Sequence, residues 1–224
     1  MADIDYPLMN QLLFEGKSEE IKKMSEDALT QGHSARDILN KGLIAGMNVV
    51  GEDFKRNRVY LPEVVIAARA MKAGMEVLNP LLTQKGSGQR SMGTLVMGTV
   101  KGDLHDIGKN LVLMMAEGAG FKCINLGVNT SVEKYIQAIR EHKADILGMS
   151  ALLTTTMTYM KVVVDELGHQ GLGHVKVCVG GAPLNQMFAD EIGADGYAPD
   201  AASAVELFKS LMAAQNAQTY AELG

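Results

Sequence analysis

Residues 1–83 carry apolar side chains at helical spacing. Apolar residues recur every three or four positions in four stretches, which is the pattern of amphipathic helices. Gly16, Gly32 and Gly51 fall between the stretches, where helix ends favour a left-handed residue. A capping-box pattern at Ser34–Asp37 marks the start of the third helix. The spacing therefore predicts a small antiparallel four-helix bundle.

The apolar pattern changes at residues 84–91, a polar stretch rich in glycine and serine. Such a composition has nothing to bury and is typical of a flexible linker. It divides the chain into two predicted domains, residues 1–83 and residues 92–224.

The second domain alternates short apolar runs with helical segments. The runs expected to form strands are residues 94–100, 123–126, 146–150, 175–179 and 196–197. Helices are expected over residues 108–119, 131–142, 156–167 and 184–192, and from residue 201 onward. Strict alternation with continuously apolar strands indicates a parallel sheet covered on both faces. The predicted fold class is α/β, a flavodoxin-like (Rossmann-like) doubly wound sheet of five strands following a four-helix bundle; such sheets bind ligands beyond the carboxyl ends of their strands.

Composition and charge exclude several classes of protein. Apolar residues make up 47% and charged residues 21% of the chain, as in an ordinary globular protein. A net charge of -5 provides no basic field, so we expect no nucleic-acid partner. The acidic start lacks the apolar core of a signal peptide, and no run is long enough for a membrane span. We therefore expect a cytoplasmic protein without a membrane partner.

The loop after the first predicted strand carries the most distinctive chemistry. His105 stands between Asp103 and Asp106, and Gly108 opens the helix that follows. The glycine-rich nucleotide-binding motifs are absent from this loop. A neutral imidazole oriented by a carboxylate is a good metal ligand, but one His cannot hold a bare zinc-type ion. Either the metal brings most of its own ligands, as in a macrocycle, or the loop is an ordinary polar surface.

Two further motifs lie at the carboxyl ends of the third and fourth predicted strands. Ser150-Ala151-Leu152 follows Gly108 after 41 intervening residues, and Gly180-Gly181 follows Leu152 after 27. With them the sequence resembles the cobalamin-binding family, whose signature is Asp-x-His-x-x-Gly, Ser-x-Leu and Gly-Gly at these separations. The helical first part, including residues 51–55 and 60–64, looks like the cap of methionine synthase and of stand-alone corrinoid proteins of anaerobic methyltransferase systems, of the methylamine, methanol or O-demethylase type.

The resemblance implies a role for each matching residue. His105 matches the lower axial ligand of cobalt, which replaces the dimethylbenzimidazole of the cofactor in the base-off, His-on state. Asp103 matches the carboxylate that binds this His, and Thr156 matches a hydroxyl that completes the relay; these three form the implied catalytic group. The implied cofactor contacts are Asp103, Leu104, His105, Asp106, Ile107, Gly108, Ser150, Leu152, Thr154, Gly180, Gly181 and Ala201.

The function implied by the resemblance is that of a methyl carrier. Its Co(I) centre would accept a methyl group from a substrate-specific methyltransferase, forming methyl-Co(III). A second methyltransferase would pass the group to tetrahydrofolate or coenzyme M, and a reductive activase is a further expected partner. The chain lacks a large barrel for either substrate, so we expect a subunit of a multicomponent system rather than a complete enzyme. Methoxylated aromatics, methylamines, methanol and quaternary amines all remain possible methyl donors.

Three other classes of protein share parts of this pattern. A cobalamin-dependent regulator or sensor would carry a DNA-binding domain before the cap. A subunit of a carbon-skeleton mutase shares the His loop but binds its cofactor against a barrel rather than a helical cap. A metal-free flavodoxin-like signalling module would show no cobalamin absorbance after purification with the cofactor.

Overall fold

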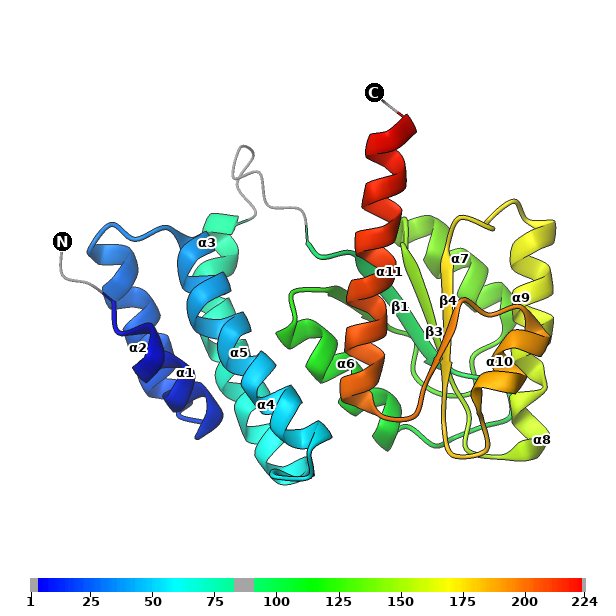
Figure 1. The fold of residues 1–224 in the computed structure, drawn as a ribbon, viewed down its shortest axis with the longest axis horizontal. Helices are drawn as coiled ribbons and strands as arrows, with labels where there is room; N and C mark the ends of the chain where they lie inside the picture. The colour runs from blue at the N-terminus through cyan, green and yellow to red at the C-terminus, as the bar shows by residue number, and fades with distance from the viewer. Residues whose placement is uncertain (1–3, 83–90, 223–224) are drawn as a thin grey trace. The chain divides into compact units, whose positions relative to one another are not determined.

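A computed structural model of the chain describes residues 4–82 and 91–222. Its backbone contacts divide it into a helical unit that ends before Ser91 and an α/β unit that begins there (Figure 1). The linker predicted at residues 84–91 lies, except for Ser91, outside the described residues.

The helical unit consists of amphipathic helices packed on a shared apolar core. Its elements are α1 (Tyr6–Phe14), α2 (Ser18–Thr30), α3 (Ala35–Asp37), η1 (Ile38–Ile44), α4 (Ala45–Lys55) and α5 (Leu61–Leu82). The elements α3, η1 and α4 follow one another without a break, so they occupy the place of the third predicted helix. Fully buried side chains from different helices form the core: Met9, Leu13, Ile21, Leu43 and Leu78.

The start of the third helix is capped as the sequence predicts, but its end is not where we expected. The Ser34 hydroxyl accepts the backbone N–H of Asp37 (3.0 Å). Gly51, expected between helices, lies inside α4. The residues after it favour a helix, and an ion pair one turn apart between Glu52 and Arg56 (2.6 Å) supports this last turn. One glycine inside a helix costs about 1 kcal/mol, which does not prevent the helix from continuing through Gly51.

The α/β unit has the predicted architecture. Its strands are β1 (Thr94–Thr99), β2 (Lys122–Asn125), β3 (Ile146–Ser150), β4 (Lys176–Gly180) and β5 (Gly196–Ala198). They form one parallel sheet in the order β2-β1-β3-β4-β5. Its helices are α6 (Ile107–Gly118), α7 (Val132–His142), α8 (Thr154–Met157), α9 (Tyr159–His169), α10 (Gln186–Ile192) and α11 (Ala201–Glu222). The predicted fold class is therefore confirmed.

Helices cover both faces of the sheet (Figure 1). On one face α7, α9 and α10 pack on a core that includes Val96, Ile139 and Leu147. On the other face lie α6 and α11, and Phe208 of α11 makes an edge-on ring contact with Phe121, centroids 6.0 Å apart. Because all strands are parallel, their carboxyl ends meet at one edge of the sheet, which holds the loops of the predicted site.

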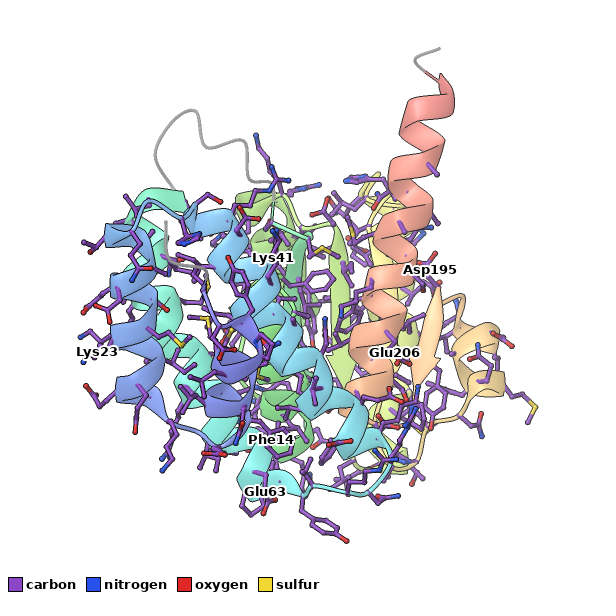
Figure 2. All side chains as sticks on the ribbon, turned by 60° about the vertical axis from the view of Figure 1, so that its left-hand side comes forward. Phe14, Lys23, Lys41, Glu63, Asp195 and Glu206 are labelled. Atoms are coloured by element: carbon purple, nitrogen blue, oxygen red, sulfur yellow. The ribbon has the colours of Figure 1, made fainter. Side chains whose placement is uncertain are left out.

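Apart from Lys109, the charged side chains of the helices whose burial is described are not buried. Figure 2 shows Lys23 on α2 and Glu206 on α11, and both are exposed. Among the described residues, no helix combines the length and the apolar character needed to cross a membrane.

Candidate functional site

The loop after β1 turns sharply and brings Asp103 into the interior. The backbone N–H of Asp103 donates to the carbonyl of Val100 (3.1 Å) and closes the turn. Gly102 in this turn has a φ of +85°, a left-handed conformation that glycine adopts at little cost. The carboxylate of Asp103 is fully buried as a result.

Four hydrogen-bonding groups converge on this carboxylate. Oδ1 accepts the backbone N–H of His105 (3.0 Å) and lies 2.8 Å from Nδ1 of the His105 ring. Oδ2 accepts the backbone N–H of Leu152 (2.8 Å) and the hydroxyl of Thr156 (2.7 Å). A carboxylate has about four lone-pair sites, so the acceptor capacity of Asp103 is fully used. The buried charge of Asp103 thereby joins the loop after β1 to Leu152, which follows β3, and to helix α8.

These contacts fix the protonation of the pair. Burial by itself raises the pKa of Asp103, but the hydrogen bonds from Leu152, His105 and Thr156 outweigh it and hold the pKa far below its usual range. The carboxylate is therefore ionised at neutral pH and only accepts hydrogen bonds. In the neutral form of the His105 ring, Nδ1 must then carry the proton, which leaves a lone pair on Nε2.

His105 presents that second nitrogen at the surface. Its side chain is 51% exposed, and within the described part of the chain Nε2 has no hydrogen-bond partner. The buried hydroxyl of Thr99 donates to the backbone carbonyl of His105 (2.9 Å) and ties it to the end of β1. The site therefore offers one basic nitrogen on a fixed backbone with a fixed tautomer.

Large apolar side chains of the same loops are also left exposed. Leu104 and Ile107, close to His105 in sequence, are 71% and 74% exposed, and Leu152 and Leu153 are 44% and 43% exposed. Apolar side chains gathered around a polar group indicate a surface that binds a partner or ligand. A single nitrogen ligand among apolar side chains fits a metal held in a large organic ring.

Comparison with known proteins assigns both units to cobalamin-binding families. Two family models, each described as a B12 binding domain, match residues 93–206 and residues 9–79. A corrinoid protein of Desulfitobacterium hafniense is 40% identical over 206 residues, which cover 91% of this chain and 95% of that protein. A dimethylamine corrinoid protein of Methanosarcina acetivorans is 46% identical over 178 residues, which cover 79% of this chain and 83% of that protein. This chain belongs to the B12-binding corrinoid protein family.

A solved structure supports the assignment to this family. A chain of the methanol:cobalamin methyltransferase complex MtaBC from Methanosarcina barkeri matches with a TM-score of 0.82 at 30% identity, covering 92% of this chain and 78% of that chain. The cofactor of this corrinoid protein is therefore a cobalamin or a related corrinoid, as the sequence motifs predict.

A row of small residues ends the strands beside His105. Thr99, Ser150, Gly180 and Ala198 are neighbours in register across four strands, and all have small side chains. A Cβ placed on Gly180 would meet only the carbonyl oxygen of Ala198 within 4 Å, at 3.2 Å. A ligand group laid along this row would contact the backbone directly, which fits the nucleotide tail of a corrinoid.

The second glycine of the Gly-Gly motif has a different structural reason. Gly181 has a φ of +134°, and a Cβ at this position would collide with the carbonyl oxygen of Ala151. The close approach of the loops after β3 and β4 therefore requires glycine here, whether or not a ligand is bound.

The remaining predicted contacts lie at the same sheet edge but outside the Asp103 network. Asp106 accepts a hydrogen bond from Asn110 (3.0 Å) at the start of α6, and a Cβ on Gly108 would meet nothing within 4 Å. Thr154 is exposed in α8, and Ala201 is buried in the first turn of α11.

Sequence reasoning missed the roles of Thr99, Lys109 and Asn129 in supporting the loop. Thr99 was counted only as a strand residue, although a hydroxyl inside an apolar run was a possible signal. Lys109 is buried, and its Nζ donates to Oδ1 of Asn110 (2.5 Å) and of Asn125 (2.8 Å). Burial lowers the pKa of Lys109, and Asp106 opposes that shift. Asn129 also contacts the loop, and nothing in its local sequence indicates its partner.

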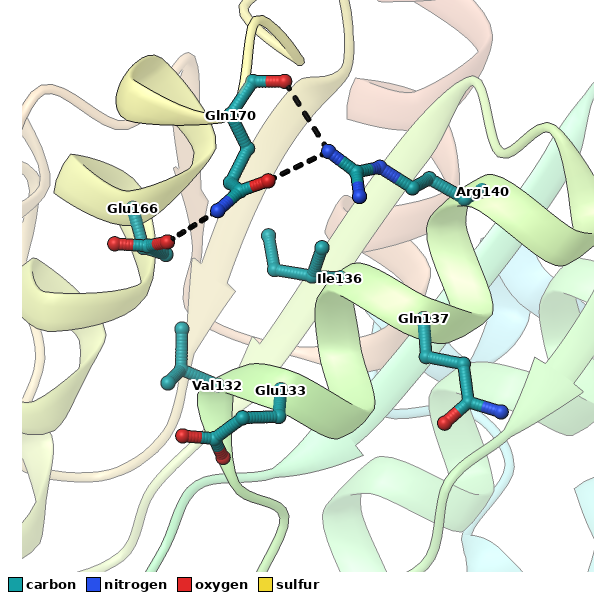
Figure 3. Close-up of a pocket in the computed structure, with 7 residues that line it drawn as sticks. All are labelled: Val132, Glu133, Ile136, Gln137, Arg140, Glu166 and Gln170. Carbon is teal, nitrogen blue, oxygen red and sulfur yellow. Dashed lines mark hydrogen bonds between the residues drawn. The ribbon is translucent and has the colours of Figure 1, made fainter.

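A groove of about 580 Å³ lies away from this site, between α7 and α9 (Figure 3). Arg140 donates to the side-chain oxygen of Gln170 (2.6 Å), and Gln170 donates to Glu166 (2.8 Å). None of the predicted site residues lines this groove; the lining residues are Val132, Glu133, Ile136, Gln137, Arg140, Glu166 and Gln170.

Proposed function

We propose that this corrinoid protein is a methyl carrier and that His105 is the lower axial ligand of its cobalt. The observation that carries the proposal is the His105 ring itself: Nδ1 is held by a buried carboxylate, and Nε2 is exposed among apolar side chains. Metal-binding His residues typically donate their other ring nitrogen to a carboxylate, which raises the basicity of the ligand.

A bound corrinoid supplies a cobalt centre that takes a methyl group from one partner and gives it to another. His105 would bind this centre through Nε2, and the row formed by Thr99, Ser150, Gly180 and Ala198 would receive the displaced nucleotide tail. Leu104 and Ile107 would contact apolar parts of the corrin ring and exclude water from them.

The Asp103 network would also favour uptake of a proton by His105 when the His105 ring leaves the metal. A proton that reaches the freed Nε2 converts the ring to imidazolium, and the ionised carboxylate of Asp103 stabilises that charge. The hydroxyl of Thr156 and the amide of Leu152 keep the carboxylate ionised throughout. Ligand exchange at the metal would thereby be coupled to proton uptake at His105.

The names of relatives support methyltransferases as partners. They include a dimethylamine corrinoid protein, a trimethylamine corrinoid protein and the methanol:cobalamin methyltransferase complex. For this chain we propose a substrate-specific methyltransferase as the donor and a second methyltransferase that delivers the group to tetrahydrofolate or coenzyme M. A reductive activase would restore the reduced state of the cofactor.

Electron paramagnetic resonance tests the ligand. Protein grown with ¹⁵N-histidine, loaded with cobalamin and reduced to the Co(II) state should show a doublet coupling where unlabelled protein shows a triplet. The His105→Ala variant should lose the histidine coupling completely. His169, exposed at the end of α9, provides the control, and His169→Ala should keep the wild-type spectrum.

The carrier role is tested separately with methyl donors. Reduced holoprotein is incubated without air with methylamine, methanol or methoxyaromatic methyltransferases and their substrates, and its absorbance is followed. Methylation by one of these systems supports the proposal. A protein that binds cobalamin through His105 but accepts a methyl group from none of them would favour a sensor instead.

A further inference from the structure

Asn129 contacts the Asp103 loop from the neighbouring connection between β2 and α7. Its side-chain Oδ1 accepts the backbone N–H of Gly102 (2.8 Å). Its own backbone N–H donates to the carbonyl of Asp103 (2.9 Å). One residue therefore holds the Gly102–Asp103 segment at both ends, through its side chain and its main chain.

The backbone conformation explains why asparagine stands at this position. Asn129 has a φ of +50°, in the left-handed region that most side chains avoid. Glycine adopts this conformation more easily but has no side-chain acceptor. Asparagine tolerates it and supplies an oxygen for the Gly102 amide.

The connection that carries Asn129 is itself tied to the sheet. On one side, the amide of Gly127 donates to Asn125 Oδ1 (2.9 Å), which also accepts from the buried Lys109 (2.8 Å). On the other side, the amide of Thr130 donates to the carbonyl of Thr99 (2.9 Å). The connection is therefore held on both sides of Asn129 by hydrogen bonds that do not involve Gly102 or Asp103.

We propose that Asn129 is a positioning residue for the ligand His105, acting through Asp103. The Asp103 carboxylate contacts both His105 and Thr156 from the turn in which Gly102 has a left-handed φ. Asn129 fixes that turn from outside the loop. The inference rests on the proposed role of His105, but its structural part concerns only the Asp103–His105 pair.

Nuclear magnetic resonance of the apoprotein tests this structural part. The ¹⁵N shifts of the His105 ring report its tautomer at about pH 8.5, above the usual histidine range. Wild-type protein should have the proton on Nδ1. Asn129→Gly keeps the backbone conformation and removes the acceptor, so the proportion of the other tautomer should rise about fivefold, the usual effect of one lost hydrogen bond.

Matched variants separate positioning from general stability. Asn129→Asp retains an acceptor and should restore the wild-type tautomer. Asn57 lies in the helical unit with a similar φ of +56°, and Asn57→Gly should leave the His105 shifts unchanged. An Asn129→Gly protein that loses stability but keeps the wild-type tautomer would overturn the proposal.

The holoprotein then tests the functional part. In the Co(II) spectrum, the fraction of cobalt coupled to ¹⁵N-histidine should fall in Asn129→Gly and recover in Asn129→Asp. If wild-type protein itself shows no histidine coupling, the ligand role of His105 is wrong, while the tautomer result still decides the contact of Asn129. If the tautomer changes and the coupled fraction does not, Asn129 acts on the apoprotein alone and its proposed role toward the ligand is rejected.

Discussion

The His105 loop and the groove between α7 and α9 use polar groups in opposite ways. In the loop, four hydrogen-bonding contacts converge on Asp103, and the outcome is one exposed ring nitrogen without a partner among the described residues. In the groove, Arg140, Gln170 and Glu166 bind one another in a closed series. The loop leaves one ring nitrogen available to a ligand, whereas in the groove Arg140, Gln170 and Glu166 bind one another.

For the site that we propose at His105, a hollow surface is a poor guide. The groove is a measurable concavity, but its hydrogen bonds serve the packing of two helices. The loop holds a basic atom in a fixed orientation beside exposed apolar side chains, which is what a cofactor requires. Convergence of contacts on a buried charge distinguishes the two regions better than shape does.

The largest effect on stability is expected at Gly181, and Gly171 beside the groove serves as its matched comparison. Gly181→Ala forces a Cβ into the carbonyl of Ala151 at a left-handed φ, and should lower the free energy of unfolding by about 3 kcal/mol. Gly171, beside the groove, has a φ of +68° and open space around it, so Gly171→Ala should cost about 1 kcal/mol. Urea unfolding followed by circular dichroism measures both, and equal losses would contradict the account of Gly181.

Acid should affect the two regions differently as well. The pKa of Asp103 is depressed in the folded protein, so its stabilisation is present above the unfolded pKa of about 3.9 and is lost as the pH falls below it. Between pH 5 and pH 2, wild-type apoprotein should lose about 2 kcal/mol more stability than Asp103→Asn. Unfolding curves at a series of pH values test this, and parallel losses in the two proteins would show that Asp103 is not the group responsible.

The smallest effect is expected in the groove. Arg140→Ala removes an exposed hydrogen bond to Gln170 and should change stability by about 0.5 kcal/mol or less. It should leave the affinity for cobalamin unchanged, as measured by absorbance titration. A several-fold loss of cobalamin affinity in this variant would assign the groove a part in cofactor binding and remove the contrast between the regions.

The sequence predicted the fold well where local pattern and long-range pairing agree. Apolar runs and helical segments alternate clearly after residue 91, so the parallel sheet was predictable. The π-helical element η1 was not, because apolar spacing does not distinguish a widened helix from a regular one. The prediction that Gly51 lies between helices was wrong for a related reason. A glycine ends a helix only where the residues that follow it do not favour a helix.

The site was predictable only in part. Asp103, His105 and Leu152 belong to motifs that the sequence displays, and the resemblance added Thr156. The supports Thr99 and Asn129 belong to no motif, because their partners depend on which strand ends meet across the sheet. Gly181 was assigned to the ligand, whereas the structure also requires it for the contact with Ala151.

The network around Asp103 also has a consequence for the synthesis of the protein. Its contacts come from residues as far along the chain as Leu152 and Thr156, and β1 must pair with β3 before they meet. During synthesis the helical unit emerges first and has its own core, while Oδ2 of Asp103 lacks the Leu152 and Thr156 partners until β3 and α8 have left the ribosome. A nascent chain that ends before residue 150 should therefore be unable to hold a corrinoid, although it already contains His105.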